Sequence, residues 1–203
     1  YKKGYFTTIN NKKVECYILE NNINTIPEKF YYKASLNTQK STIQTKSIQE
    51  LFISPNTKYE RHIVEIDDSS SISSELSTTR LSQFTKKSLL LKVLLAGNHT
   101  LLQYQTSEIK RFFVQNTDTI FPLEYKLYRT KNNQVMKNLV YQKQLKEYFN
   151  CKKKPVRTTI DYNSSSLVKY FITYNSCQGG KVTNYTYRNK GVLNLKGKFS
   201  MGS

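Results

Sequence analysis

Glycine, proline, histidine, acidic residues and long apolar runs are all scarce in this sequence. Seven glycines and four prolines among 203 residues are too few for a fibrous or a disordered chain. No run of about 18 apolar residues occurs, so the sequence predicts no helix that spans a membrane. The only histidines, His62 and His99, lie far in sequence from the three cysteines, and no Cys-x-x-Cys pair occurs, so a zinc site lacks support.

Aromatic residues are abundant, with 16 tyrosines and 10 phenylalanines, although the apolar fraction is only 37%. Rings and β-branched residues fit the pleated surface of a strand, so this composition favours a sheet. A chain of 203 residues is long enough to bury a core, and it suits one domain, alone or with a small appended module.

The densest apolar stretch, from Ser88 to Val114, is expected to form the centre of that sheet. Residues 89–95 read LLLKVLL, an almost unbroken run of strand length that suits a strand covered on both faces. Gly97 and Asn98 provide a turn, because both tolerate a positive φ. Two more apolar segments follow before residue 114, so the stretch predicts a meander of three strands.

Shorter segments that alternate polar and apolar residues predict further strands on both sides of this meander. The first is a hairpin over residues 1–18, with its turn at Asn10 and Asn11. The other strands are expected at residues 30–34, as one or two strands between 41 and 53, at 59–66 and, as a single strand, at 120–129.

Residues 67–87, DDSSSISSELSTTRLSQFTKK, are the one low-complexity stretch and are expected to form a surface loop. If the chain were an enzyme, its substrate pocket would be expected beneath this loop. Ser88, either histidine and Asp118 make a catalytic triad only on paper, because the nucleophile elbow that positions such a serine is absent. The sequence therefore predicts no catalytic residue and no cofactor.

The spacing of apolar residues changes to that of a helix in the last third of the chain. A first helix is predicted over residues 135–149, and a second over 164–174, where apolar residues recur at i, i+3, i+4 and i+7. The serines at 164–166 are expected to cap the second helix, and the glycines at 179–180 follow its end.

These elements predict an α+β fold, mainly antiparallel sheet in hairpins and a meander, followed by two C-terminal helices. We expect a β-rich domain over residues 1–130, a basic two-helix module over 131–190 packed on it, and a membrane-barrel strand that starts within 191–203. Residues 191–203 alternate small or apolar residues with polar ones, a pattern typical of an outer-membrane barrel strand. An edge strand of a soluble sheet has the same pattern.

The net charge of +18 is concentrated near the C-terminus. Residues 1–130 carry 18 lysines and arginines against 12 acids, whereas residues 131–203 carry 14 against two. Such asymmetry favours an anionic partner, such as nucleic acid, an acidic glycan, phospholipid head groups or an acidic protein surface. The other interpretation is a lysine-rich composition that only solvates the surface.

Cys151 and Cys177 each follow one of the two predicted helices. A disulfide between them would close a loop of about 26 residues and stabilise the fold by about 3 kcal/mol, provided that the compartment is oxidising. Such a bridge calls for helices that cross steeply, because antiparallel packing would separate their C-termini. Free buried thiols and a metal site are the alternatives, and Cys16 is expected to be a buried thiol in a strand.

Tyrosine and phenylalanine rings interleave with lysines across residues 141–190, as they do in proteins that bind single-stranded nucleic acid. The rings, however, fall at the spacing of a helix core, and the sequence contains no recognisable nucleic-acid-binding module. Nucleic-acid binding is therefore an alternative function. It predicts a reduced, cytoplasmic protein whose affinity falls steeply with salt.

Four segments together resemble the N-terminal extramembrane region of Bacteroidota outer-membrane proteins of the small β-barrel (PorT-like) type. They are YKKGYFTTINNKKVECYI, LLLKVLLAGNHTLLQYQTSEIKRFFV, the helix ending YFNCKKK and the helix VKYFITYNSC. The resemblance spans nearly the whole chain and lies in the order and character of the segments. It implies an exported precursor whose soluble β-rich domain precedes a barrel, of which this chain would hold part of the first strand. The missing initiator Met before Tyr1 fits a processed chain or a fragment.

Outer-membrane barrels usually keep both chain ends on the periplasmic side, so the resemblance implies a periplasmic domain of a protein in the cell outer membrane. We then expect a non-catalytic binding or assembly module of the cell envelope. Its partner would be a subunit of an envelope complex, an anionic polymer or lipid head groups. The predicted contact residues are Lys143, Lys146, Lys152, Lys153, Lys154, Arg157 and Lys169.

Overall fold

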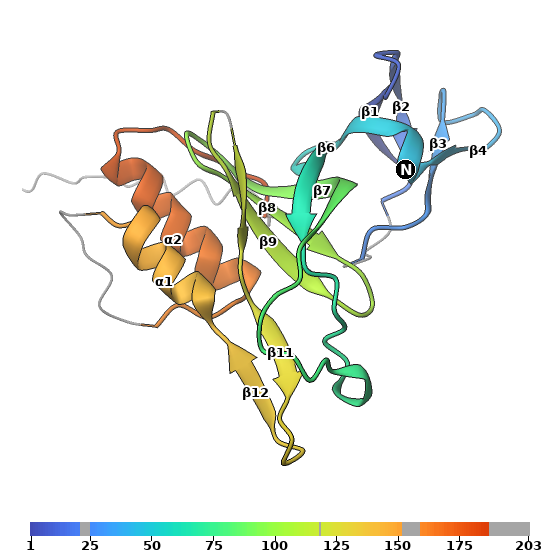
Figure 1. The fold of residues 1–203 in the computed structure, drawn as a ribbon. Helices are drawn as coiled ribbons and strands as arrows, with labels where there is room; N and C mark the ends of the chain where they lie inside the picture. The colour runs from blue at the N-terminus through green and yellow to red at the C-terminus, as the bar shows by residue number, and fades with distance from the viewer. Residues whose placement is uncertain (21–24, 118, 152–158, 187–203) are drawn as a thin grey trace, which may run out of the picture.

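The computed structural model of the chain describes residues 1–20, 25–117, 119–151 and 159–186. Within these ranges the fold is α+β, an extensive antiparallel sheet with two helices near the C-terminus, which confirms the predicted fold class (Figure 1). No helix among these residues is both long and apolar enough to cross a membrane. Outside the described residues lie Asp118, Lys152, Lys153, Lys154, Arg157 and the strand predicted within 191–203.

An antiparallel sheet of 11 strands runs through the molecule in the order β10-β9-β8-β7-β6-β5-β1-β2-β3-β4, with β13 paired to the end of β7. The chain builds it from two meanders, β1–β4 and β5–β10, which join where β5 pairs with β1. The strands are β1 Lys2–Thr8, β2 Lys13–Ile18, β3 Lys29–Lys33, β4 Ser41–Gln44, β5 Ile48–Ile53, β6 Thr57–Ile66, β7 Thr85–Ala96, β8 Thr100–Gln105, β9 Lys110–Gln115, β10 Ile120–Leu123 and β13 Thr183–Asn184.

Strand β7 is covered on both faces, as its apolar run predicts. Leu91 and Val93 belong to a core cluster formed mainly by residues of strands β6–β9. Leu94 and Leu95 belong to a second cluster, which the helices cover from outside. A third cluster lies in strands β1–β5, which we call the N-terminal arm, and Leu90 of β7 reaches into it. The sheet therefore carries three separate cores along its length.

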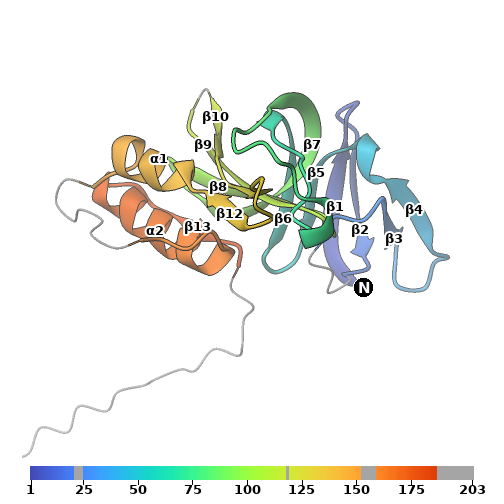
Figure 2. The ribbon, with the colours of Figure 1, turned by 60° about the horizontal axis from the view of Figure 1, so that its bottom comes forward.

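Helices α1 (Val140–Tyr148) and α2 (Ser164–Cys177) form the helix layer, which lies at one end of the sheet, away from the N-terminal arm (Figure 2). Phe171 of α2 and Phe112 of β9 are fully buried between the helix layer and the sheet. Burial of such a ring stabilises the fold by roughly 1.5–3 kcal/mol. These contacts fix the helices on strands β7–β10.

The cap of α2 is Asn163, so the expectation that serines 164–166 supply the cap is wrong. The Asn163 Oδ1 accepts a hydrogen bond from the Ser166 N–H at 2.9 Å, and the Asn163 backbone is extended. Asparagine is as good a cap as serine, and here it precedes the serines, which form the first turn. Gly179 follows the helix with a positive φ of 73°, as the sequence predicts.

Two predicted elements in the middle of the chain are wrong in detail. The single strand expected at 120–129 is two strands, β10 in the main sheet and β11 (Lys126–Arg129) in a separate hairpin. The helix expected from residue 135 begins at Val140, because Val135–Asn138 forms strand β12 and pairs with β11. This hairpin also spans residue 130, where we placed a domain boundary.

The serine-rich loop is shorter than expected, because β7 already begins at Thr85. Residues 67–84 are irregular apart from one 3-10 turn at Ser73–Glu75. Elsewhere in the chain, a second 3-10 turn at Thr45–Ser47 joins β4 to β5. The extended residues 85–87 pair with the end of β6. Strand pairing therefore overrides the low-complexity composition at this end of the loop.

Candidate functional site

The structure joins Cys151 to Cys177 in a disulfide, with Cα atoms 6.1 Å apart. The predicted pairing is therefore present, but the steep helix crossing that we expected is not. The helices run in the same direction, so their C-terminal ends lie at the same end of the layer (Figure 1). The Tyr170 hydroxyl fixes this arrangement, since it lies 2.9 Å from the Leu145 carbonyl oxygen and 2.8 Å from that of Phe149.

His99 lies beside the bridged end of the helix layer and is held there by packing. Its ring contacts those of Tyr174 and Phe149, with centroids 4.9 and 5.8 Å away. Asn175 accepts a hydrogen bond from the His99 N–H at 2.9 Å and donates one to its carbonyl at 3.0 Å. Burial lowers the pKa of His99 below its usual 6.5. This histidine is therefore a half-buried residue whose surroundings disfavour its charged form.

Among the described residues, neither histidine lies beside Ser88 as the triad written from the sequence would require. Ser88 pairs with Ile63 near the start of β7, whereas His99 follows the other end of that strand. His62 lies opposite Leu89, the neighbour of Ser88, so its side chain projects from the other face of the sheet and contacts Glu60 there, with the carboxylate 3.2 Å from its Nε2 atom. Neither histidine is thus placed to serve as a base for Ser88.

The helix layer exposes the lysines that the sequence predicts as contact residues. Lys143 and Lys146 on α1 and Lys169 on α2 are all exposed. The Lys143 Nζ lies 3.7 Å from a carboxylate oxygen of Glu147, but both groups face solvent, where such pairs contribute little. Because the disulfide joins the ends of the two helices, these lysines are carried on one rigid layer.

Most rings that interleave with these lysines are core residues and cannot stack on a nucleic acid. Tyr141, Phe149, Tyr170 and Tyr174 are each at most 7% exposed and belong to the cluster beneath the helix layer. Tyr148 is the exception on α1, since 68% of it is exposed. The spacing that suggested a helix core in the sequence therefore describes these rings correctly.

A buried ionic cluster anchors the serine-rich loop at residues 67–84. The Asp67 carboxylate accepts hydrogen bonds from the Ser69 and Gln83 N–H groups at 2.9 and 2.8 Å, and the Lys126 Nζ lies 3.3 Å away. Burial alone would raise the pKa of Asp67, but these hydrogen bonds and the Lys126 charge hold it below its usual range. Arg111 completes the cluster by donating to the Asp67 carbonyl at 2.8 Å.

The cavity beside this cluster measures only about 10 Å³. That volume holds at most one water molecule. A second hollow at the loop measures about 310 Å³ and is lined by Ser71 and Ile72 together with Tyr125 and Tyr162. The described residues contain no group of three or more histidine, cysteine, aspartate or glutamate side chains that could hold a metal ion.

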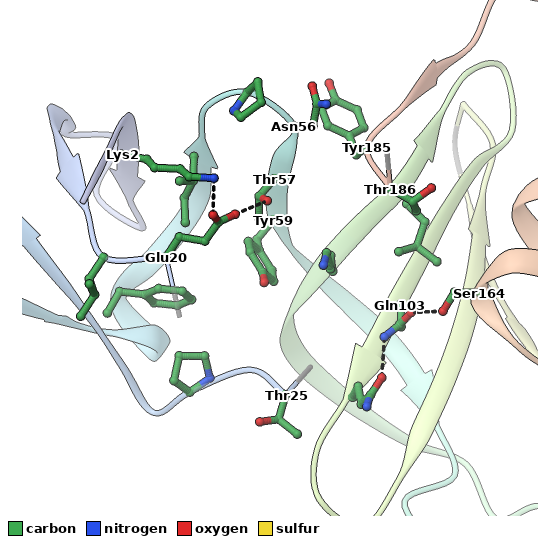
Figure 3. Close-up of a pocket in the computed structure, with 18 of the residues that line it drawn as sticks. Lys2, Glu20, Thr25, Asn56, Thr57, Tyr59, Gln103, Ser164, Tyr185 and Thr186 are labelled. Carbon is green, nitrogen blue, oxygen red and sulfur yellow. Dashed lines mark hydrogen bonds and ion pairs between the residues drawn. The ribbon is translucent and has the colours of Figure 1, made fainter. Parts of the chain in front are cut away.

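A cleft of about 730 Å³ lies between the N-terminal arm and strands β7–β9 (Figure 3). Figure 3 shows Glu20 on the wall formed by the arm, Gln103 on the opposite wall, and Tyr59 pointing into the space between them. The segment that follows Thr25 crosses from one wall to the other, where the Ile26 N–H donates to the Gln105 carbonyl at 3.1 Å. We refer to this hollow as the cleft.

Positive charge predominates in the lining of the cleft. Glu20 contributes a carboxylate, but one of its oxygens lies 2.5 Å from the Lys2 Nζ, and the other accepts a hydrogen bond from the Thr57 hydroxyl at 3.1 Å. Burial raises the pKa of Tyr59 to about 12, so its hydroxyl stays protonated. Besides this single carboxylate, the lining contains four ammonium groups, those of Lys2, Lys29, Lys92 and Lys110.

The cleft cannot be recognised from the sequence, because its walls come from distant segments and no motif links them. The alternating pattern around residues 101–105 could have shown that Gln103 and Gln105 share a face, but not that this face is hollowed. Comparison of the chain with known protein families, with curated proteins and with solved structures finds no match. The function must therefore be inferred from the disulfide, the helix layer and the cleft.

Proposed function

We propose that this chain is a non-catalytic binding module of the cell envelope, the periplasmic part of an outer-membrane protein. The disulfide between Cys151 and Cys177 carries the proposal, because such bridges persist in oxidising compartments such as the bacterial periplasm and are rare in the cytoplasm. The resemblance of the sequence to PorT-like outer-membrane proteins supports the same location.

The helix layer is the surface that contacts an anionic component of the envelope. Lys143, Lys146 and Lys169 stand exposed on it, and Glu147 is the one acidic residue of α1 and α2. A lysine near an anionic membrane surface contributes about 1 kcal/mol to binding. Three lysines on a rigid layer therefore supply about 3 kcal/mol, which is enough for reversible association.

The alternative, a nucleic-acid-binding protein, gains no support from the helix layer. Apart from Tyr148, the rings of this layer discussed above are buried, so they cannot act as a platform for bases. Its disulfide favours a compartment that holds no nucleic acid.

Charge reversal on the helix layer tests the proposal. In the variant Lys143→Glu, Lys146→Glu, Lys169→Glu, we expect binding at low salt to vesicles that contain phosphatidylglycerol to fall by more than about a hundredfold. Peptidoglycan is the second probe, because it separates a lipid partner from a polymer. A second variant reverses Lys152, Lys153, Lys154 and Arg157, which the sequence predicts as contacts.

The matched control reverses Lys12, Lys40 and Lys46, three exposed residues of the N-terminal arm. This control changes the net charge as much as the triple helix-layer variant does and should bind to both probes nearly as well as the wild type. If the two charge-reversal variants associated with vesicles and peptidoglycan as strongly as the control did, the proposed contact residues would be wrong.

A further inference from the structure

The wall of the cleft that strands β6–β9 form is a row of polar side chains in register across neighbouring strands. Tyr59 of β6 lies opposite Lys92 of β7, and Lys92 lies opposite Gln103 of β8. Two residues further along β8, Gln105 lies opposite Lys110 of β9. Apolar clusters flank this row, one in the N-terminal arm and one beneath the helix layer. Burial of such a polar row between two apolar cores is costly. Its position along the wall of a large cleft therefore indicates a binding site.

A chain of hydrogen bonds sets the polarity of this row. The Ser164 hydroxyl donates to the Gln103 Oε1 at 2.7 Å, and the Gln103 amide donates to the Gln105 Oε1 at 2.8 Å (Figure 3). Because the Gln105 oxygen is used as an acceptor, its amide nitrogen is the donor end of the chain. Gln105 and Lys110 are cross-strand neighbours, so the wall presents amide and ammonium donors side by side.

The opposite wall adds a further cation and an aromatic ring. The Lys29 Nζ lies 5.6 Å from the centre of the Tyr31 ring, and both side chains line the cleft. Lys29 and Lys110 thus face the same space from different walls, the first from β3 and the second from β9. Ammonium groups on both sides of a cleft favour a ligand with more than one anionic group.

We propose that the cleft binds an acidic oligosaccharide, which is a second binding site, separate from the helix layer. Sugar hydroxyls both donate and accept, and so match the amides of Asn56 and Gln105 and the hydroxyls of Thr25 and Thr57, while sugar carboxylates match the lysines. The volume of about 730 Å³ lies within the range of roughly 300–1,000 Å³ that is usual for ligand sites.

Two other ligand classes fit the cleft less well. A lipid tail requires an apolar lining, whereas amides, hydroxyls and ammonium groups line much of this one. An extended peptide usually binds by pairing with an exposed strand edge, but strands β6, β7 and β8, which form this wall of the cleft, are each paired on both sides.

Calorimetric titration of the whole chain with trigalacturonate, an acidic trisaccharide, tests the proposal. We expect saturable binding, and the double variant Lys29→Gln, Lys110→Gln should weaken it at least tenfold. The variant Gln105→Glu should weaken binding by a similar factor, because it keeps the oxygen that accepts from Gln103 and replaces the amide donor with a carboxylate. The double variant Lys12→Gln, Lys46→Gln is the matched control, since it removes the same charge from exposed sites outside the cleft.

The control variant and the helix-layer variant Lys143→Glu, Lys146→Glu, Lys169→Glu should both bind trigalacturonate like the wild type. This result keeps the cleft distinct from the proposed envelope contact, whichever of the two fails its own test. Urea unfolding of each variant establishes that the substitutions leave the protein folded.

Four outcomes of the oligosaccharide, variant and phosphate titrations would overturn the proposal, and a fifth comes from a peptide. They are the absence of trigalacturonate binding, equal binding by the cleft variants and the control, binding of the neutral trisaccharide maltotriose that is as tight, and binding of inorganic phosphate that is as tight. Tighter binding of the peptide Glu-Glu-Glu would also contradict it, because the site would then recognise acidic peptides.

Discussion

Removal of the Cys151–Cys177 bridge should destabilise the protein by about 3.5 kcal/mol. The bridge closes a loop of 26 residues. In the chain-entropy relation, a loop of that length removes about 12 cal/mol/K from the unfolded chain, which corresponds to about 3.5 kcal/mol at 25 °C. Without the bridge, α1 and α2 are held together at this end by Tyr170 and by the core beneath them.

Urea unfolding followed by circular dichroism measures this change. With a slope of about 2.5 kcal/mol per molar urea, the midpoint should fall by about 1.4 M when the wild type is reduced. The double variant Cys151→Ser, Cys177→Ser should show the same shift without reductant, and reductant should have no further effect on it.

Cys16 provides the control for reduction. It is buried in the N-terminal arm, where burial raises the pKa of its thiol to about 11, so it stays an unreactive thiol. The variant Cys16→Ala should therefore respond to reductant by the same shift as the wild type. If reduction moved the wild-type midpoint by less than about 0.3 M, the bridge would not constrain the unfolded chain as the loop length requires.

Three further perturbations test single residues. Burial holds the pKa of His99 below 6.5, so as the pH falls the imidazole is protonated in the unfolded chain before it is protonated in the folded protein. The urea midpoint should therefore be lower at about pH 5.5 than at about pH 8, and this difference should be smaller in the variant His99→Phe. Hydrogen bonds from His62 and Lys58 lower the pKa of Glu60 from 4.5 to about 2, so the folded protein loses stability as the pH falls from about 4.5 to about 2. The variant Glu60→Gln should lose less thermal stability over this pH range, and a loss equal to that of the wild type would contradict this role. Asn163→Ala should cost about 1 kcal/mol in urea unfolding through the lost cap of α2, whereas Ser165→Ala should cost far less; equal costs would refute the capping role.

The parts of the fold that the sequence predicts well are those with strong periodicity. The apolar run at residues 89–95 indicates a strand covered on both faces, and β7 lies between two cores. The helical spacing from residue 164 indicates α2, and the positions of Cys151 and Cys177 after the two helices indicate their pairing. In each case local pattern and tertiary packing favour the same structure.

The errors arise where tertiary contacts decide the structure. Alternation continues through residues 124–125, so it does not show that the chain leaves the main sheet there and starts β11. Val135 and Met136 fit a helical pattern, but pairing with β11 makes them a strand. The parallel packing of α1 and α2 likewise depends on the core beneath them, which neither helix sequence defines by itself.

The cleft is the part of the candidate site that the sequence could not reveal. Its lining brings together Lys29, Lys92 and Lys110, which come from three distant strands. Each lysine alone looks like an ordinary solvated charge. Only the register of β6–β9 and the position of the N-terminal arm bring them to one space.

The redox state of the cysteines in the cells that make the protein tests its location in the envelope most directly. Cells are quenched with acid and fractionated, and the denatured protein is labelled with a maleimide that adds mass to each free thiol. Of the three cysteines, we expect Cys16 alone to be labelled before reduction and all three afterwards, in protein from the outer-membrane fraction. Three labels before reduction, in protein from the cytoplasmic fraction, would contradict a periplasmic binding module.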